Sequence, residues 1–553
     1  MRPAELPPCD LVMKGGVTSG IVYPGAVAEL AKRYRFANLG GTSAGAVAAA
    51  VAAACEYARQ GGESIELKGI LDVAQDARRP GFFLDLFQPT PSAQPLLSLV
   101  YALAGARGSH RRQVIALARA AVRRRPVQAI GTLAAAAVLL ALGALAVSRL
   151  PIGLALVLAV VAALVVALLT AGAVLGPLVA IVRGAWRSLP GAGFGVCSGL
   201  ASPGAPDALT DWLHASVQRC AGLPPGQPLT FAMLQARGIA LRMVATDLGL
   251  ARPVTMPFAE EQYLFSPAEL SALFPAPVVD HVLAVAGVGP QDRHSTRTWF
   301  LPGAQLPVVI GVRLSASVPV LLSSLRLYTA DADADGPIES YMTDGGLTSN
   351  FPIHFFDDWL PSHPTFGLDL VGVPAVGEEP VFMPAGDEVG HRLAPRPVTG
   401  LGGFVGRVQD AARSWRDEAQ AELPGYRDRV CQIRMGPGEG GFHLDANPDQ
   451  VGVLMDRGRE AGREILRSFD WERHRVTRYL TLMALLRENF GLLAERLSGA
   501  PPPVAPDPDA GAWAAAVDAA VAELARHAGP PAAGQPGGVP PAGRAAMSIG
   551  PRL

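Results

Sequence analysis

The sequence predicts an α/β protein with a mainly parallel central sheet. Short apolar segments typical of strands alternate with helical segments, and the first two of these strands run directly into glycines. Half of the 553 residues are apolar, 17% are charged and the mean hydropathy is +0.26, which excludes a mainly disordered chain. The formal net charge of −1 leaves no global basic field that would recruit nucleic acid.

The individual elements follow from local patterns. Short apolar runs predict strands at 10–13, 36–39, 240–246, 308–312, 365–373 and 430–435. Longer segments without a helix breaker predict helices at 26–33, 44–59 and 449–469. The alternation of the two types favours one α/β domain in which the last strand and helix belong to the same sheet.

Two long uncharged segments interrupt this domain, separated by a short turn that contains Arg149. A helix of about 20 apolar residues crosses a bilayer core. The segments therefore predict a transmembrane hairpin with spans at about 127–148 and 152–175, the second ended by Gly176-Pro177. A pair of buried core helices in a soluble protein is the alternative, although core helices are usually shorter.

Charge around the hairpin predicts its orientation. Arginines gather before the first span and after the second, at Arg111, Arg112, Arg119, Arg123, Arg124, Arg125, Arg183 and Arg187. The positive-inside rule therefore puts both outer ends in the cytoplasm, and a multi-pass protein of the cytoplasmic (inner) membrane is expected. The basic stretch 107–125 could instead bind RNA, but no aromatic residues interleave with it, so a membrane-surface anchor is favoured.

Cysteine usage and the two chain ends carry less information. The five cysteines form no C-x-x-C pair, which predicts reduced, buried thiols and no zinc site. The N-terminus has no long apolar run, so no secretory signal peptide is expected. Residues 498–553 are rich in Pro, Ala and Gly and predict a disordered tail with one short helix at 512–527.

The first chemical motif is a glycine loop, KGGVTSG at residues 14–20, directly after the first strand. Adjacent glycines near a helix N-terminus leave backbone N–H groups free to face a phosphate or an oxyanion. No G-K-[ST] sequence closes the loop, so it is not a Walker A motif. A plain tight turn is an equally good interpretation of this loop taken alone.

The second motif is G-x-S-x-G, formed by Gly41, Ser43 and Gly45 between a strand and the Ala-rich helix. This is the strand–turn–helix setting of a nucleophile elbow, in which small flanking residues allow the sharp turn and leave the serine hydroxyl accessible. The helix N-terminus next to it favours developing negative charge. The sequence therefore predicts Ser43 as a nucleophile.

The third motif is Asp344-Gly345-Gly346, followed by NFP at 350–352. D-G-G is also a common turn, so Asp344 is either a catalytic carboxylate or a loop residue without a role. An elbow this early in the chain does not fit an α/β-hydrolase, in which several strands precede the serine and a histidine follows the acid.

Together the three motifs resemble the patatin-like phospholipase family, with smaller likenesses at 245–247 (ATD) and 315–319 (SASVP). The resemblance covers about residues 9–497 and implies a three-layer fold around a mainly parallel sheet. The resemblance and the hairpin together predict four parts of the chain. Residues 9–105 form a first patatin-like part and 106–187 an inserted basic segment with the hairpin. Residues 188–497 form a second patatin-like part and 498–553 the tail.

The resemblance implies a serine acyl hydrolase of the phospholipase A or lysophospholipase type, which cleaves lipid carboxylic esters at the membrane surface. Ser43 would be the nucleophile and Asp344 the general base of a dyad that needs no histidine, no metal and no cofactor. Backbone N–H groups at Gly15, Gly16 and Val17 would form the oxyanion hole. The residues that support these motifs are Lys14, Gly20, Gly41, Gly45, Gly345 and Gly346. The implied partners are a phospholipid or lysophospholipid and the bilayer, with no nucleic acid, and the catalytic domain would face the cytoplasm.

The glycine loop departs from the family pattern G-G-G-x-[RK]-G. Val17 stands where a glycine is usual and Ser19 where a basic residue is usual. Lys14 either supplies the missing charge or is an ordinary lysine at a strand end. This departure keeps a non-catalytic patatin-fold membrane protein, binding lipid or a partner, as the alternative. An α/β-hydrolase esterase is a third hypothesis and would need an essential histidine, for which His354 is the candidate, although a structural role on the following helix is favoured.

Overall fold

A computed structural model of the chain describes most of the α/β domain. The described residues are 5–94, 188–372, 379–384, 425–439 and 447–499 with gaps at 17, 63–67, 91–92, 330–335 and 437–438, and scattered positions in 130–187, 398–411 and 519–523.

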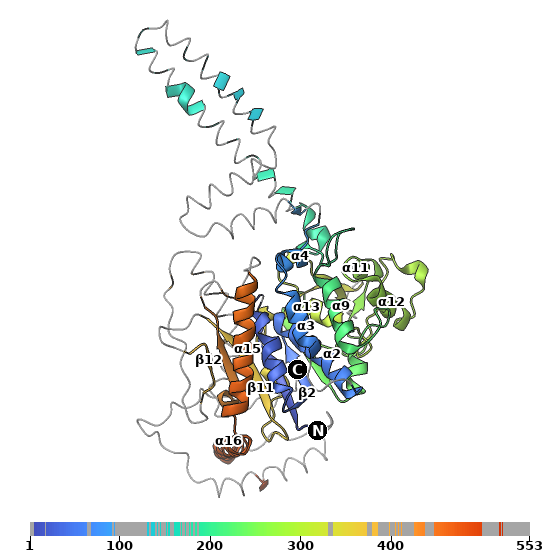
Figure 1. The fold of residues 1–553 in the computed structure, drawn as a ribbon, viewed down its shortest axis with the longest axis vertical. Helices are drawn as coiled ribbons and strands as arrows, with labels where there is room; N and C mark the ends of the chain where they lie inside the picture. The colour runs from blue at the N-terminus through green and yellow to red at the C-terminus, as the bar shows by residue number, and fades with distance from the viewer. Residues whose placement is uncertain are drawn as a thin grey trace.

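An eleven-stranded sheet forms the centre of the described structure (Figure 1), in the order β12-β13-β11-β1-β2-β4-β10-β9-β6-β7 with β5 paired to β4. Its strands are β1 (Pro8–Met13), β2 (Arg35–Gly41), β4 (Ala240–Asp247), β5 (Arg252–Met256), β6 (Leu264–Phe265), β7 (Trp299–Phe300), β9 (Leu325–Thr329), β10 (Ile338–Asp344), β11 (Thr365–Val371), β12 (Val381–Phe382) and β13 (Val430–Arg434). A separate pair consists of β3 (Gly195–Cys197) and β8 (Val320–Leu322). The central strands β13, β11, β1, β2 and β4 are parallel, and the outer pairings are antiparallel. The predicted α/β class with a parallel sheet centre is confirmed.

Helices cover the sheet and connect its strands. They are α1 (Tyr23–Leu30), α2 (Ala44–Gln60), α3 (Lys68–Asp76), α4 (Phe82–Leu86), α9 (Leu209–Ala221), α10 (Phe231–Gln235), α11 (Pro267–Ser271), α12 (Ala276–Val285), α13 (Val308–Ser315), α15 (Pro448–Ser468) and α16 (Trp471–Gly499). Short 3-10 turns lie at η2 (Thr18–Val22), η3 (Pro190–Ala192), η4 (Pro290–Asp292), η5 (Gly345–Leu347), η6 (Ile353–Phe355) and η7 (Arg427–Arg429). On one face of the sheet Leu11 and Met13 of β1 join the large core under α1, α2 and α15, and on the other face Val12 packs with Phe351 and Tyr426.

Most predicted elements are confirmed within a few residues: β1, β2, β4, β11, β13, α1, α2 and α15. The predicted strand at 308–312 is wrong, because these residues form α13. Every residue of α13 is buried. A short run that is apolar on all sides has no period that separates a buried strand from a buried helix, so the pattern alone could not decide.

The predicted hairpin lies mostly outside the described residues. Those described in 130–184 are helical apart from Pro151, and their large apolar side chains are exposed: Ile130, Val138, Leu154, Val157, Val160, Val161, Leu164, Val165, Leu168 and Val179. They lie beyond α4, on the far side from α16 (Figure 1). Helical residues recur as far as Ser188, so helical structure continues past the end expected at residue 175. Within the described part of the chain, no helix has the length and apolarity needed to cross a membrane.

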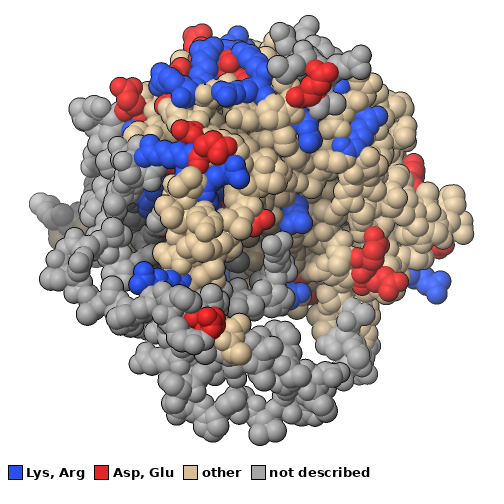
Figure 2. Space-filling view, turned by 90° about the horizontal axis from the view of Figure 1, so that it is seen from below, with Lys and Arg blue, Asp and Glu red and all other residues tan. Residues whose placement is uncertain are grey.

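The remaining expectations concern cysteines, tail and charge. All five cysteines are buried and free, as predicted. The tail beyond α16 lies outside the described residues except Ala519, Ala520 and Glu523, which are helical. On the face seen from below in Figure 2, basic and acidic side chains of the described residues are interspersed rather than gathered into one basic surface.

Candidate active site

Ser43 lies in a sharp turn between β2 and the N-terminus of α2. Its backbone has φ 54° and ψ −122°, a conformation that non-glycine residues adopt only when the surrounding structure enforces it. The turn needs glycine on both sides, because a Cβ on Gly41 would lie 2.4 Å from the backbone of Gly45, and one on Gly45 would lie 2.1 Å from the carbonyl oxygen of Met13. The predicted strand–turn–helix setting of this serine is therefore present.

The sheet register brings Asp344 to Ser43. Gly41 at the end of β2 lies opposite Met243 of β4, and Asp344 at the end of β10 lies opposite Ala245 of the same strand. The Ser43 hydroxyl donates a hydrogen bond of 2.7 Å to Asp344 Oδ2, although the two residues are 301 positions apart. Both are buried, with exposed fractions of 6% and 7%.

The D-G-G turn fixes the other carboxylate oxygen of Asp344. Asp344 Oδ1 accepts a hydrogen bond of 2.7 Å from the backbone N–H of Gly346. Gly345 begins η5 and lies against β4, where a Cβ would meet the Val244 carbonyl oxygen at 2.2 Å. The two glycines therefore allow the carboxylate to turn back on its own loop, with Oδ2 directed at the serine hydroxyl.

The end of α13 and the residues directly after it contact both Ser43 and Asp344. The N–H of Ser43 donates to Ser315 Oγ at 3.1 Å. The carbonyl oxygen of Ser317 accepts from the N–H of Asp344 at 2.9 Å and from the Thr343 hydroxyl at 2.8 Å. Residues 315–317, here called the serine strap, therefore hold the nucleophile turn on one side and the carboxylate strand on the other.

Arg313 anchors the serine strap from inside the core. Its guanidinium is 1% exposed, donates to the carbonyl oxygens of Ser198 and Ser323 at 2.9 Å each, and bonds the Ser317 hydroxyl. Burial lowers the pKa of Arg313 to about 10, which still leaves the side chain charged at neutral pH. Residues 315–319 resemble the family pattern and could be singled out from the sequence. The role of Arg313 as the anchor of the strap could not, because its hydrogen-bond partners are distant in the chain.

The glycine loop meets Ser43 with a carbonyl group. Gly16 O lies 3.1 Å from the Ser43 hydroxyl, whose single proton it shares with the nearer Asp344 Oδ2, and it accepts from the N–H of Ala44 at 3.4 Å. The N–H of Gly15 donates to the Asn350 carbonyl oxygen at 2.8 Å, so in this arrangement it is occupied. Val17, the third residue predicted for the oxyanion hole, lies outside the described residues. Gly20 lies in η2 against Ala44, where a Cβ would approach the alanine Cβ to 2.8 Å.

Lys14 and His354 have partners of their own. Lys14 Nζ forms an ion pair of 2.6 Å with Asp369 of the neighbouring strand β11, so this carboxylate balances its charge. His354 lies in η6 with its ring 5.0 Å from that of Phe355 in an edge-to-face contact. Within the described residues, no group of three or more His, Cys, Asp or Glu side chains could hold a metal ion.

A cavity of about 150 Å³ opens beside Ser43. Helices α2, α3, α4 and α9 line it, and the lining is almost entirely apolar, with Val47, Val51, Ile70, Phe83, Leu86 and Trp212 among its side chains. An apolar cavity that ends at a serine hydroxyl can take a hydrocarbon chain whose polar head reaches that hydroxyl.

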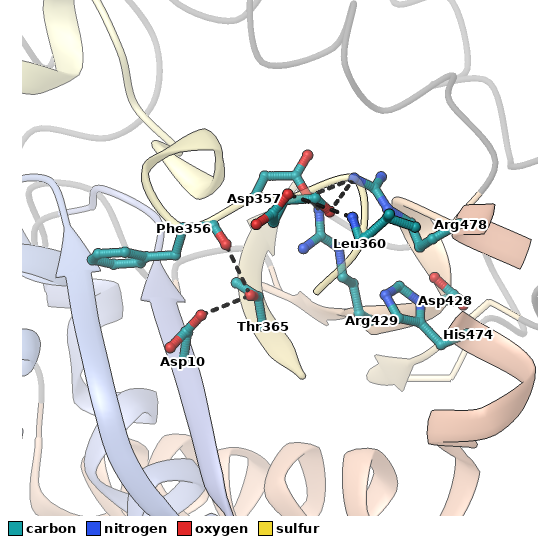
Figure 3. Close-up of polar contacts among 10 residues, drawn as sticks. Asp10, Phe356, Asp357, Leu360, Thr365, Asp428, Arg429, His474 and Arg478 are labelled. Carbon is teal, nitrogen blue, oxygen red and sulfur yellow. Dashed lines mark hydrogen bonds and ion pairs between the residues drawn. The ribbon is translucent and has the colours of Figure 1, made fainter. Parts of the chain in front are cut away.

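A second polar cluster lies near the start of β11 (Figure 3). Ser43 instead follows the end of β2, and β2 and β11 both run parallel to β1, so the two sites lie at opposite ends of the parallel strands. Asp357 Oδ1 accepts from the buried guanidinium groups of Arg429 at 2.7 Å and Arg478 at 3.0 Å. His474 Nδ1 contacts Asp428 Oδ2 at 2.8 Å. These contacts tie α16 and η7 to the residues that precede β11, which indicates a structural role far from Ser43.

Comparisons with known proteins identify the family of the chain. A family model described as patatin-like phospholipase matches residues 11–160, which include the glycine loop and the turn of Ser43 but not Asp344. The chain is also 33% identical over 559 residues to a curated protein of Rhizobium meliloti (strain 1021) named RpoH suppressor. That alignment covers 87% of this chain and 85% of the relative, whose printed name states no reaction.

Proposed function

From its membership in the patatin-like phospholipase family, we propose that this chain is a serine acyl hydrolase that cleaves carboxylic esters of phospholipids or lysophospholipids. The family supports lipid acyl hydrolysis in general. The observation that carries the specific proposal is the hydrogen bond of 2.7 Å between the Ser43 hydroxyl and Asp344 Oδ2 beside an apolar cavity. A hydroxyl bonded to a carboxylate at a helix N-terminus is arranged for nucleophilic attack.

In the proposed mechanism Ser43 Oγ attacks the ester carbonyl carbon while its proton passes to Asp344 Oδ2. Collapse of the tetrahedral intermediate returns that proton to the leaving alcohol and leaves an acyl-serine. A water molecule then attacks the acyl-serine, and Asp344 accepts its proton. Collapse of the second tetrahedral intermediate breaks the bond between the acyl carbon and Ser43 Oγ, returns the proton from Asp344 to Ser43, and releases the fatty acid. The Gly346 N–H bonded to Oδ1 keeps Oδ2 directed at the reacting hydroxyl throughout.

The oxyanion hole of this mechanism requires a change at Gly16. A developing oxyanion is repelled by a carbonyl oxygen, so the Gly16 carbonyl has to turn away from Ser43. That rotation would bring a loop N–H toward Ser43 and release the Ala44 N–H from its bond of 3.4 Å to Gly16. Gly15, held by Asn350, then serves as the fixed end of the moving loop. We therefore propose the donors at the Gly16–Val17 peptide and Ala44.

The membrane location is part of the proposal. The exposed apolar side chains of the described helical residues between 130 and 184 support an inserted hairpin with spans near 127–148 and 152–175. Ser43 precedes this segment and Asp344 follows it, so the chain has to cross the bilayer twice for the two to meet. The proposed division of the chain remains 9–105, 106–187, 188–497 and 498–553, in the inner membrane with the catalytic part facing the cytoplasm.

A non-catalytic, lipid-binding member of the family is the second candidate. The carbonyl of Gly16 favours it, because this group lies where an active oxyanion hole needs a donor. Labelling with a fluorophosphonate probe separates the two candidates. The proposal expects labelling of the wild type and none of Ser43→Ala, while Ser266→Ala, a buried serine bonded to the Ser295 carbonyl, keeps the label. A folded wild type that takes no label and releases no fatty acid would establish the non-catalytic candidate.

A further inference from the structure

Two bulky apolar residues near the cavity have a backbone conformation that such residues rarely adopt. Phe194 has φ 59° and Val320 has φ 69°, both in the left-handed region. An aromatic or β-branched side chain is strained there, and residues of this kind concentrate at functional sites. Their side chains are nevertheless exposed, by 46% and 56%. The fold therefore maintains strained backbone at two positions whose apolar side chains face outward.

The two strained residues lie side by side. Strands β3 and β8 pair in parallel with Gly195 opposite Val320, and Phe194 directly precedes Gly195. The Phe194 ring is supported from behind by an edge-to-face contact of 5.1 Å with Tyr341. The pairing of the two short strands therefore brings the two exposed residues close together on the protein surface.

This surface borders the mouth of the cavity. Val318 and Leu322, on either side of Val320, line the cavity, and Val318 is partly exposed. From α4, Phe83 also lines the cavity and is partly exposed, while its neighbour Leu84 is 43% exposed. Exposed apolar residues therefore adjoin the cavity lining in two separate segments of the chain.

We propose that Leu84, Phe194 and Val320, here called the apolar rim, dock the cavity mouth on the surface of a lipid bilayer. An ester-bearing lipid would then move from the membrane into the cavity beside Ser43 without crossing water. This inference rests on the proposed function and adds to it the surface through which the substrate arrives. Apolar side chains that leave water for the acyl boundary of a bilayer stabilise such docking.

Continuity with the preceding segment identifies the bilayer as the occupant. Phe194 follows η3, and η3 follows the segment whose described large apolar side chains, from Ile130 to Val179, are exposed. Arg183 and Arg187, both exposed, lie between that apolar segment and the rim. Cationic side chains at this position attract anionic lipid headgroups. If the apolar segment lies among the acyl chains, Arg183 and Arg187 lie at headgroup depth, and the rim follows them within a few residues.

The strain at the rim provides a test that separates docking from stability. Asparagine tolerates the left-handed region better than valine or phenylalanine, so Val320→Asn and Phe194→Asn should leave the melting temperature unchanged or raise it. The matched control is Leu360→Asn, which changes a side chain of similar exposure (58%). Leu360 lies near the start of β11 (Figure 3), away from the strand ends that precede Ser43 and Asp344.

The first measurement compares two substrates for the full-length protein reconstituted in vesicles that contain phosphatidylglycerol. Fatty acid release from the vesicle lipid should fall about 10-fold in each rim variant, because a docking side chain is lost. Hydrolysis of water-soluble p-nitrophenyl butyrate should stay within about twofold of the wild type, because the Ser43 site is unchanged. Leu360→Asn should alter neither rate. An unchanged vesicle rate in both rim variants, or an equal fall in both rates, overturns the proposal.

The second measurement does not depend on catalysis. The five native cysteines are buried, so an environment-sensitive dye can be attached selectively to Val320→Cys or to Leu360→Cys. The dye at position 320 should shift to the blue on phosphatidylglycerol vesicles, and the dye at 360 should not. A wild type inactive on both substrates would refute the proposed function, while the dye at 320 would still decide the docking. A dye at 320 that responds to protein concentration rather than to vesicles indicates a second copy or a protein partner and overturns the bilayer as occupant.

Discussion

The backbone N–H of Ser43 donates to the hydroxyl of Ser315 across 272 positions of the chain. This bond joins the strained turn of the nucleophile to the serine strap, whose Ser317 carbonyl holds the backbone of Asp344. The relative position of hydroxyl and carboxylate is therefore set by a third segment that supplies neither group.

Loss of the Ser315 hydroxyl should impair catalysis more than folding. Ser315→Ala leaves the Ser43 N–H buried without its acceptor, which costs about 1–2 kcal/mol of unfolding free energy. The turn then relaxes, and a shift of the nucleophile by an ångström lowers kcat roughly 100-fold. Fluorophosphonate labelling rates and melting temperatures measure the two effects. Ser323→Ala is the control, because it removes a buried hydroxyl that bonds the Cys197 carbonyl rather than the Ser43 turn, and it should lower stability alone. Equal labelling rates in the two variants would contradict a positioning role for Ser315.

Removing either member of the proposed dyad should abolish ester hydrolysis. Ser43→Ala lacks the nucleophile, and Asp344→Asn keeps the shape of the side chain but cannot accept the proton. Because the two groups act together, the double variant should be no slower than either single variant. Fatty acid release from phospholipid vesicles gives the rates. Substantial hydrolysis by Ser43→Ala would remove this residue as the nucleophile.

Hydrolysis should need neither a metal ion nor His354. Activity is expected to survive EDTA in calcium-free buffer, and His354→Ala should keep most of it, because the ring packs against Phe355. The measurement is the release of p-nitrophenol from an activated ester before and after each change. A fall of several orders of magnitude in His354→Ala would favour a histidine-dependent triad.

The pair of His363 and Asp10 should make stability depend on pH. His363 Nε2 lies 2.8 Å from Asp10 Oδ1, and this hydrogen bond raises the pKa of His363 above its ordinary value of 6.5. The protonated form is favoured by folding, so its contribution is complete below pH 6.5 and is lost as the pH rises through the folded pKa. Melting temperatures should therefore fall over that range in the wild type, and more steeply than in His363→Gln. Identical slopes in the two proteins would exclude the pair as the cause.

The proposed topology can be tested by labelling from outside the cell. A cysteine at Ser148, in the turn of the hairpin, should react with an impermeant thiol reagent on intact cells, and one at Ser188 should react only after lysis. The native cysteines are buried and provide a low background. Recovery of the whole protein in the soluble fraction without detergent would refute the hairpin.

The sequence predicted the parts of this molecule that depend on near neighbours. Ser43 was identifiable because Gly41 and Gly45 stand beside it, and Asp344 because two glycines follow it. Arg313 could not be recognised, since its partners at Ser198 and Ser323 are set by tertiary packing.

The dependence on distant residues also explains why 308–312 was predicted as a strand and why the orientation of the glycine loop could not be predicted. The apolar run of α13 carries no period that reveals a buried helix. The orientation of the Gly16 carbonyl also depends on distant residues, because the loop is fixed at Gly15 by Asn350.

The order of the strands has a consequence for synthesis of the chain on the ribosome. β1 pairs with β11, so Asp10 stays without its partner Thr365 until more than 350 further residues have been translated. The turn of Ser43 is translated early, but the serine strap, Asp344 and the neighbouring strand β4 are all translated after the apolar segment at 127–175. A nascent chain therefore finishes the apolar segment before the hydroxyl of Ser43 can meet the carboxylate of Asp344. Under the proposed function, a truncated product that ends before residue 344 is inert, and so is the growing chain until the remaining strands have been translated.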